Sequence, residues 1–434
     1  MQWLELHNVE YGECIVLGGA HHDILMVDCG SINQKIREGD VSFTSYVDPV
    51  LLERYAGCSG KEFLLTHYHR DHLCGLYQIL ARRGGYFDRI FLPVSPADAK
   101  GRALLLEFAL FVYAFLPRHS DYALVNISAL RIFSRVAKLA GADRVYPLAA
   151  GSNFAFDGVT YDVIWPDASG YPFSSLFASI VENLDVCLSS PFLPEVAGRF
   201  LKKKEAFCKA YAECCKTVPL TPEHIARLDV LLDDVDAMIP ELLLLPSAPD
   251  VVQILTDAVT RTAYSDELNA AGIIFHNRRT SEASLDDILM TGDATPESLD
   301  AVADRLYSDY YIIKAPHHGT ASHWSHLLSE LSSSHILISN GEYQKGGKIA
   351  EEYIDLPAIK HCTNCTACGW YQSSSCSCNR LACCYELPQG AGLTIKCPRC
   401  QKREGSAPCG IYVVTHGGER SCLCDEFPIE PAEK

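Results

Sequence analysis

Alternating and continuous apolar positions over residues 1–94 predict a series of short β-strands. QWLELH and ECIVLGG alternate polar with apolar side chains, and HHDILMVDCG and KEFLLT finish in apolar runs. FDRIFLPV adds a buried strand, whereas residues 97–141 have mostly helical spacing. SNFAFDGVTYDVIWP predicts a β-hairpin, because apolar side chains alternate on both sides of Asp157 and Gly158.

The spacing changes to that of helices between residues 170 and 262. In LTPEHIARLDVLLDDVDAMIP, Thr221 is suited to cap a helix and Pro222 to begin it. Apolar side chains then recur at helical spacing from Ile225 to Val235, as they do on the buried face of a helix. Strand patterns return in AGIIFH, DDILMTGD, YYIIKAP and HILISNG.

This order of patterns predicts an α/β fold in four segments. Residues 1–169 and 263–345 would form the two halves of one strand-rich fold, with a helical insertion over 170–262 between them. Residues 346–434 would form a cysteine-rich module that also contains a closing strand, GIYVVTHGG. We expect the insertion to cover a site as a cap or to bind a protein partner; a peripheral bundle without functional contacts is the alternative.

The net charge of −17 over 434 residues argues against a broad basic surface for nucleic acid or an anionic membrane. It leaves a nucleic-acid substrate open, because bound metal ions supply positive charge locally. The opening MQWLELHNVEYGE lacks the basic start and apolar core of a signal peptide. The most apolar run, Ala103 to Leu116, is too short to span a bilayer and includes Glu107. We therefore expect a cytoplasmic, soluble protein without a membrane partner.

The segment FLLTHYHRDHLCGL brings three histidines and an aspartate together directly after a predicted strand. In a loop at that position, His67 and His69 can point one way while Asp71 and His72 point another. Imidazole and carboxylate groups arranged in this way can hold two metal ions a few ångströms apart. A solvated polar loop, and an inactive scaffold that keeps its ligands, are the alternatives.

Two later strands end in residues that can complete such a site. ILMTGD presents Asp293 directly after an apolar run, where its carboxylate can bridge two metal ions. YYIIKAPHHGT presents His317 and His318 in the same way, and we expect about one of them to be a ligand. Asn269 precedes the AGIIF strand. Its side chain either takes part in the site or caps the local backbone through a hydrogen bond.

These motifs resemble those of the metallo-β-lactamase superfamily. THYHRDH resembles its HxHxDH signature, MVDCG its first motif with Asp28 at a strand end, and TGD its later bridging aspartate. NVEYGE, NAAGIIF, PHHGT and ISNG resemble further motifs of the hydrolase domain of ComEC-type DNA-uptake proteins and their stand-alone relatives. The matches keep the family's order and cover residues 1–166 and 269–341; they imply an αββα sandwich.

The resemblance implies a role for each residue of the two strongest motifs. His67 and His69 would be ligands of one metal ion, and Asp71 and His72 ligands of a second. Asp293 would bridge the two ions.

The remaining motifs imply supporting residues. His317 or His318 would complete the site, and Asp28 would orient the histidine loop from behind the ligands. Asn269 stands where other branches of the superfamily place a histidine ligand. Relatives often have Gly-His-Pro soon after the ISNG strand, where this chain has EYQKGGK, so occupancy by both metal ions stays open. Glu10 and Glu13 also depart from the family's Gly and Asp, and we expect them to stand away from the chemistry.

Two close metal ions with an open face suit in-line displacement at phosphorus. Asp71 and Asp293 would position and deprotonate the attacking water, and His318, in its His-His pair, would stabilise the leaving group or give it a proton. The resemblance implies a phosphodiesterase or nuclease acting on DNA or RNA. Zinc suits the imidazole ligands as one or two ions, and the carboxylates leave manganese credible.

Two further functions compete with this one. The first is an interaction subunit of a multi-protein system, such as a defence system, that hydrolyses weakly or not at all. The second is hydrolysis of a small ester, a lactone or a cyclic nucleotide.

Twelve cysteines between residues 362 and 424 predict structural zinc sites. The CxxC pairs HCTNC and CPRC have the two-residue gap of zinc knuckles. The alternative is an iron–sulfur cluster, because three closely spaced cysteines precede a distant Cys-Pro. The expected zinc ligands are Cys362, Cys365, Cys368, Cys376, Cys378, Cys383, Cys384, Cys397, Cys400, Cys409, Cys422 and Cys424.

Overall fold

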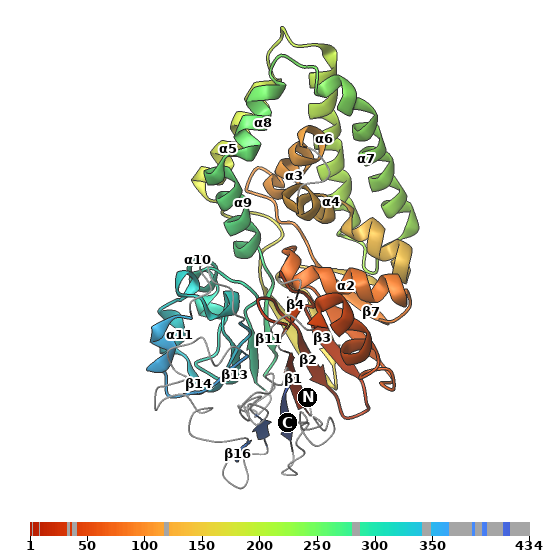
Figure 1. The fold of residues 1–434 in the computed structure, drawn as a ribbon. Helices are drawn as coiled ribbons and strands as arrows, with labels where there is room; N and C mark the ends of the chain where they lie inside the picture. The colour runs from red at the N-terminus through yellow and green to blue at the C-terminus, as the bar shows by residue number, and fades with distance from the viewer. Residues whose placement is uncertain are drawn as a thin grey trace, which may run out of the picture.

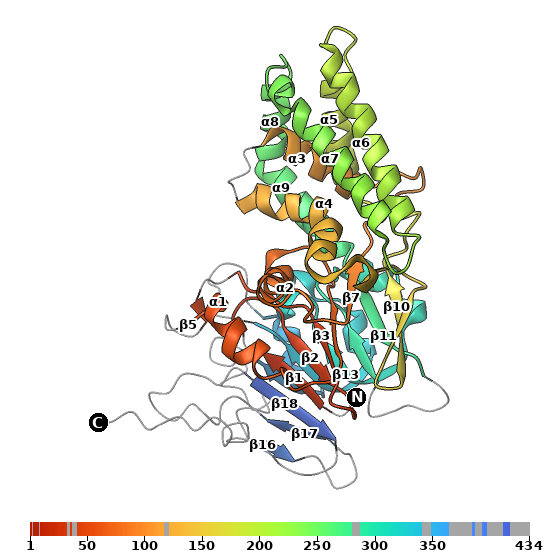
Figure 2. The ribbon, with the colours of Figure 1, turned by 90° about the vertical axis from the view of Figure 1, so that its right-hand side faces the viewer.

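The structure is a computed structural model with a mixed α/β fold built on two mixed β-sheets (Figure 1). A helical part extends from one end of the sheets, as the view in Figure 2 also shows. The α/β class expected from the sequence is therefore confirmed. Among the described helices, none is long and apolar enough to cross a membrane. The structure describes residues 1, 3–7, 9–32, 35–36, 41–116, 121–279, 287–340, 349–363, 384–386, 393–396 and 411–416.

The first sheet has the strand order β16-β17-β18-β1-β2-β3-β6-β7-β8 among the described residues. Its antiparallel half runs from β16 to β3, and its parallel half from β3 to β8. The predicted closing strand is β18, which pairs antiparallel with β1. The strands are β1 Trp3–His7, β2 Ile15–Gly18, β3 Ile24–Val27, β6 Lys61–Leu64, β7 Arg89–Pro93, β8 Val145–Leu148, β16 Cys384–Glu386, β17 Leu393–Lys396 and β18 Ile411–His416.

The second sheet has the order β15-β14-β13-β12-β11-β10-β9. Strands β9 to β12 are antiparallel, and strands β12 to β15 are parallel. Its strands are β9 Asn153–Phe156, β10 Val159–Trp165, β11 Ile274–Asn277, β12 Ile288–Met290, β13 Asp309–Lys314, β14 Ser332–Ile338 and β15 Ile359–Cys362. A separate two-stranded ribbon is formed by β4 Lys35–Ile36 and β5 Val41–Ser42.

The predicted hairpin is confirmed as β9–β10, and it connects the two sheets through its side chains. Asp157 and Gly158 both have positive φ, at 50° and 74°, as the two central residues of a type I′ turn require. Phe154 packs its ring 5.0 Å from Phe91 of the first sheet and 5.5 Å from Phe275 of the second. The two sheets therefore share an aromatic core at this point.

Short helices connect the strands. The parallel strands β6 and β7 are joined through α2, Arg70–Arg82, which begins within the histidine motif. The other short helices are α1 Phe43–Tyr46, α10 Pro296–Asp300, α11 Leu327–Glu330, the π-helical turn Val47–Leu52 and the 3-10 turns Ala142–Arg144, Ala303–Arg305, His317–Gly319, Ala321–His323 and Glu351–Ile354.

The helical part consists of long helices that lie together at the top of Figure 1. They are α3 Leu104–Phe115, α4 Asp121–Ala140, α5 Ser175–Leu188, α6 Glu195–Cys214, α7 Pro222–Leu242, α8 Ala248–Thr256 and α9 Ala258–Ala270. The helix predicted from Thr221 onward is confirmed as α7, whose N-cap side chain accepts a hydrogen bond from the backbone of His224. Its apolar face from Ile225 to Val235 is buried, as the spacing indicated.

The helical part contains two helices that precede residue 170. Phe133 of α4 stacks on Tyr211 of α6 at 5.1 Å, and Phe111 of α3 packs on Phe200 of α6 at 5.3 Å. Helix α3 is the most apolar run of the sequence, and its Glu107 forms a buried ion pair with Lys204 of α6. The pairing offsets the cost of burying the carboxylate. Both helices therefore pack against the predicted insertion.

Most of the predicted cysteine module lies outside the described residues. Cys362 is buried at the end of β15, and Cys384 begins β16. The predicted ligands outside the described residues are Cys365, Cys368, Cys376, Cys378, Cys383, Cys397, Cys400, Cys409, Cys422 and Cys424. The zinc module therefore stays a prediction.

The aromatic contact between the sheets predicts a large loss of stability on truncation. Phe154 is 4% exposed, so Phe154→Ala should lower the free energy of unfolding by about 3–5 kcal/mol through lost burial and the cavity left behind. Phe192 is 95% exposed, and Phe192→Ala should change the free energy of unfolding by less than about 0.5 kcal/mol. Urea unfolding followed by circular dichroism measures both; equal losses in the two variants would contradict the packing described.

Candidate metal centre

The histidine motif follows the carboxyl end of β6 and enters helix α2. His67 lies in the connecting loop, and His69 is the N-cap of α2 with extended backbone angles of −67° and 151°. Asp71 and His72 fall in the first turn of the helix, where the positive end of the helix dipole favours a carboxylate. The change from loop to helix separates the motif into two pairs of side chains, as the sequence predicted.

Asp293 enters the site from the second sheet, in a tight turn after β12. Gly292 has a φ of 51°, and a Cβ atom there would lie 3.0 Å from the side chain of Thr66. A larger residue would push the turn away from the histidine loop, so glycine brings the Asp293 carboxylate close to it. Asp293 is 1% exposed.

The Asp293 carboxylate lies among four histidines. Its Oδ2 atom is 3.3 Å from Nε2 of His72, 3.6 Å from Nε2 of His318 and 3.8 Å from Nε2 of both His67 and His317. These separations exceed the usual 2.7–3.2 Å of a hydrogen bond from nitrogen to oxygen. Two ligands of a tetrahedral zinc ion, each about 2.0–2.1 Å from it, lie about 3.4 Å apart. The spacing thus fits a cation between the oxygen and the ring nitrogens.

Besides an overlapping group of Glu13, Asp293 and His318, the donor atoms form two compact groups that could each hold a metal ion. One group consists of His67, His69 and Asp293, and the other of Asp71, His72 and His318; the donor atoms within each group lie within 4.8 Å of one another. The structure therefore brings together the residues that the motifs proposed as ligands, in the predicted pairs. The second group contains His318.

His318 and His317 occupy different positions. His318 is fully buried, its Nδ1 lies 3.0 Å from the carbonyl oxygen of Ser339 and its Nε2 lies 3.2 Å from Asp71. Because a carbonyl only accepts, Nδ1 donates to Ser339, and this contact directs Nε2 toward Asp71 and Asp293. The His317 side chain is 22% exposed and its Nδ1 is 2.7 Å from Thr320 Oγ1. His318 is thus the better-placed ligand.

Asp28 holds the histidine loop from behind, as its motif implied. Its Oδ2 is 2.8 Å from Nδ1 of His72, and it accepts hydrogen bonds at 2.7 Å from both the backbone and the hydroxyl of Thr66. These contacts aim Nε2 of His72 at Asp293. Carboxylates in this position commonly fix the tautomer and orientation of a metal-binding histidine.

Burial and charge set the protonation of the site. Burial lowers the pKa values of His67 and His69, which favours the neutral imidazole that binds metal. Burial also lowers the pKa of His317, to about 3. For His72, burial acts in the same direction, but the carboxylates of Asp293 and Asp28 outweigh it and raise the pKa well above its ordinary value. The centre of the site thus favours positive charge next to Asp293.

Helix α9 of the helical part reaches the site through its last turns. Ser265 Oγ lies 3.2 Å from Nε2 of His69, a contact that the sequence did not indicate. Asn269 is 2% exposed, and its side chain lies beside His69. Its Oδ1 has no hydrogen-bond partner among the described residues. Asn269 therefore lies at the site, and the helical part forms one of its walls.

Lys314 and Glu13 form a buried ion pair beside Asp293. Lys314 Nζ is 3.0 Å from Glu13, 3.6 Å from Asp293 Oδ1, and donates a 2.7 Å hydrogen bond to the Gly292 carbonyl. The expectation that Glu13 stands away from the chemistry is wrong, because its carboxylate lies 3.7 Å from Nδ1 of His318. Lys314 interrupts the apolar strand YYIIKAP, and a charged residue in a buried strand is itself a signal for a buried partner.

His323 also joins the edge of the site. Its ring stacks on that of His317 with centroids 3.8 Å apart, and it is 8% exposed. The segment EYQKGGK lies outside the described residues.

No family model matches this chain, and a search of curated proteins finds no match either.

The geometry predicts that Asp293 is needed to hold metal. Asp293→Asn removes the carboxylate charge next to both donor groups, so it should lower the metal content by about one to two ions per chain. His326→Ala, at an exposed histidine, should leave the content unchanged. Mass spectrometry of elements on chains purified from zinc-containing medium measures both. Metal bound elsewhere in the chain contributes equally to every variant and so cancels in the comparison. A metal content of Asp293→Asn equal to that of the wild type would contradict the site.

The Lys314–Glu13 pair predicts a stability effect independent of metal. Lys314→Met leaves Glu13 and Asp293 buried without their cation, so the free energy of unfolding should fall by about 3–5 kcal/mol. Lys138 forms a surface ion pair with Asp229 and is 63% exposed, so Lys138→Met should cost less than about 1 kcal/mol. Adding Glu13→Gln to Lys314→Met should recover part of the loss. Urea unfolding of these variants in the presence of a chelator measures the losses. Equal losses in Lys314→Met and Lys138→Met would refute the prediction.

Proposed function

We propose that this protein is a metal-dependent hydrolase of the metallo-β-lactamase type and that it cleaves phosphodiesters of DNA or RNA. The observation that carries the proposal is the position of Asp293 Oδ2 between two buried donor groups. A carboxylate shared in this way is typical of sites that hold two metal ions. Two mixed sheets in contact, with helices outside them, support an αββα sandwich as the fold.

The strand ends support the same fold. Asp28 and the histidine motif follow the parallel strands β3 and β6 of the first sheet. Asp293 and His318 follow the parallel strands β12 and β13 of the second. Because parallel strands present their carboxyl ends at one edge, both sheets deliver side chains to a common site.

Two divalent cations would be held by the two donor groups. When bound, they supply an activated water and offset negative charge on the phosphoryl oxygens. Imidazole and carboxylate ligands suit zinc, and manganese is the second choice. Asp71 and Asp293, as carboxylates, accept hydrogen bonds from the attacking water and take up its proton. His318 is fixed by Ser339 with its Nε2 toward Asp71, which fits a ligand better than a proton donor.

His317 is the better candidate for contact with the leaving group. It is the more exposed of the two histidines, and it lies at the edge where His323 stacks on it. Burial lowers its pKa to about 3, so at neutral pH its ring is uncharged. An uncharged ring can therefore contact the substrate without repelling the metal ions.

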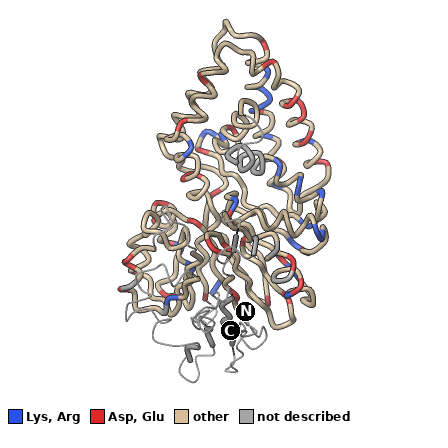
Figure 3. Tube along the Cα trace, in the orientation of Figure 1, with Lys and Arg blue, Asp and Glu red and all other residues tan. Residues whose placement is uncertain are grey.

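Charge explains why metal ions would carry the binding of a polyanion. Figure 3 shows lysine and arginine dispersed among aspartate and glutamate over the described chain, with no continuous basic band. With a net charge of −17, attraction of phosphates has to come from the site itself. The charge distribution therefore favours contacts to the few phosphates around the scissile bond over contacts to many phosphates along the strand.

The proposal predicts metal-dependent cleavage that needs the helix α2 pair. The full chain should cleave labelled DNA or RNA and bis(p-nitrophenyl) phosphate in manganese or zinc, and chelator should abolish this. Asp71→Ala/His72→Ala should lower the rate about 100-fold or more, because it removes a water-positioning carboxylate and a ligand. His326→Ala is the control.

Gel electrophoresis of the labelled strands and release of p-nitrophenol measure these rates. Turnover by Asp71→Ala/His72→Ala equal to the wild type would sink the proposal. Cleavage of lactones, carboxylic esters or cyclic nucleotides without cleavage of DNA, RNA or the synthetic diester would replace it with the small-substrate alternative.

A further inference from the structure

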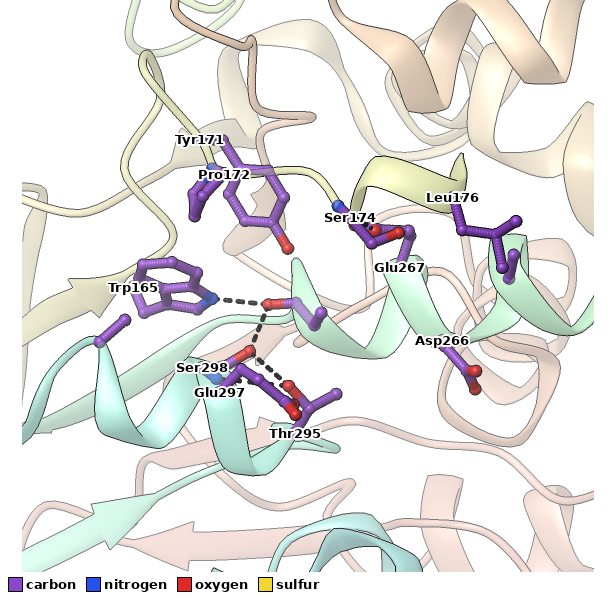
Figure 4. A pocket seen from close by; sticks show the side chains of 13 residues that line it. Trp165, Tyr171, Pro172, Ser174, Leu176, Asp266, Glu267, Thr295, Glu297 and Ser298 are labelled. Carbon is purple, nitrogen blue, oxygen red and sulfur yellow. Dashed lines mark hydrogen bonds between the residues drawn. The ribbon is translucent and has the colours of Figure 1, made fainter. Parts of the chain in front are cut away.

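A cavity of about 440 Å³ lies beside the metal centre (Figure 4). It is bounded by the end of β10, the start of α5, the last turns of α9 and helix α10. Its volume is within the range of about 300–1,000 Å³ found for small-molecule sites. The side chains that define its chemistry are Trp165, Tyr171, Leu176, Asp266, Glu267 and Glu297.

The cavity and the metal centre share two structural elements. Asp266 follows Ser265, whose hydroxyl contacts His69, and Ala270 of the cavity wall follows Asn269. Thr295 of the wall comes two residues after Asp293. The same helix and the same turn therefore contribute residues both to the cavity and to the metal centre.

Tyr171 presents its hydroxyl to the cavity. Its side chain is 3% exposed and its ring packs 5.4 Å from Trp165 and 4.6 Å from Phe173. Its hydroxyl has no hydrogen-bond partner among the described residues, and Figure 4 shows it directed into the cavity. Burial raises the pKa of this hydroxyl, so it remains a neutral group that donates and accepts. A ligand that fills the cavity displaces water from this hydroxyl, so it binds better when it offers the hydroxyl a hydrogen-bond partner.

The carboxylates of the cavity select the ligand further. Glu267 accepts a 2.7 Å hydrogen bond from the backbone of Ser174, which fixes it in the wall. Asp266 and Glu297 lie in exposed positions at the cavity's edge. These groups repel a phosphate and accept hydrogen bonds from N–H donors. Apolar atoms of Trp165 and Leu176 provide the remaining surface.

A ligand must therefore combine a flat apolar body with N–H donors and with an atom that pairs with the Tyr171 hydroxyl. A hydrocarbon leaves the hydroxyl unpaired, and a second phosphate is repelled by the carboxylates. An alkylammonium group offers positive charge and N–H donors but no acceptor, so it leaves the hydrogen of the hydroxyl unpaired. The edge of a nucleobase has donors and acceptors side by side on a planar ring.

We infer that this cavity binds the nucleobase of the nucleotide whose phosphate lies at the metal centre. The inference rests on the proposed function and names the part of the substrate that the helical part recognises. The Tyr171 hydroxyl pairs with a ring nitrogen or carbonyl of the base, and the carboxylates accept from its amino group. Helix α9 would then contact the substrate on one side and His69 on the other.

Binding of free nucleosides to the full chain tests the cavity without requiring turnover. Adenosine, guanosine, cytidine and thymidine are titrated in a calorimeter, with choline as the cationic probe. We expect at least one nucleoside to bind and choline not to bind. Tyr171→Phe should weaken nucleoside binding about fivefold, the value of one hydrogen bond. Tyr146→Phe, at a tyrosine of β8 outside the cavity, is the matched control.

A kinetic ratio gives the second readout. The kcat/KM for a dinucleotide, divided by that for bis(p-nitrophenyl) phosphate, should fall about fivefold in Tyr171→Phe and not in Tyr146→Phe. The melting temperature of Tyr171→Phe should not fall, because the lost hydroxyl has no partner in the described protein.

The outcomes separate this inference from the proposed function. Nucleoside binding that depends on Tyr171, without any diester cleavage, would refute the proposed function and keep the cavity as a base site. Diester cleavage with no nucleoside binding, with choline bound as well as nucleosides, or with Tyr171→Phe equal to the wild type would overturn the inference.

Discussion

A buried carboxylate surrounded by four imidazoles is the constraint on which the site depends. Asp293 is 1% exposed, and Oδ2 lies 3.3–3.8 Å from four Nε2 atoms, too far for good hydrogen bonds and close enough to share a cation. A buried charge is costly unless it is paired, and the neighbours of Asp293 meet that need in two ways. Lys314 pairs with its Oδ1 side, and the histidines on the other side offer the positions for metal.

The strand order explains how distant segments reach this carboxylate. The ends of β3 and β6 come from one sheet, and the ends of β12, β13 and β14 from the other. The sheets touch through Phe91, Phe154 and Phe275, so their carboxyl edges cannot shift far relative to each other. The Ser339 hydroxyl donates a 2.7 Å hydrogen bond to the Gly12 carbonyl. Contacts of this kind between the two halves of the fold fix the relative positions of the site residues.

The helical part lies against the donor residues and lines the neighbouring cavity. Its helix α9 ends beside His69 and leads directly into β11 of the second sheet. A helix anchored in this way places Ser265 and Asn269 against the ligands, and it places Asp266 in the neighbouring cavity. Changes in the helical part can therefore alter what binds next to the site without moving the donor atoms.

The sequence alone determined the strands that lead into the donor residues, the helix α7 and the pairing of donor residues, because each depends on local spacing. The β9–β10 hairpin followed from alternation around Asp157 and Gly158, and the ligand pairs followed from where strands stop. Only the tertiary structure decided that His318 is the better-placed ligand and that Glu13 and Lys314 stand at Asp293. It also decided that α3 and α4 join the helical part. Those facts depend on contacts between residues far apart in the chain, and a periodic pattern shows which face of an element is buried without showing what covers it.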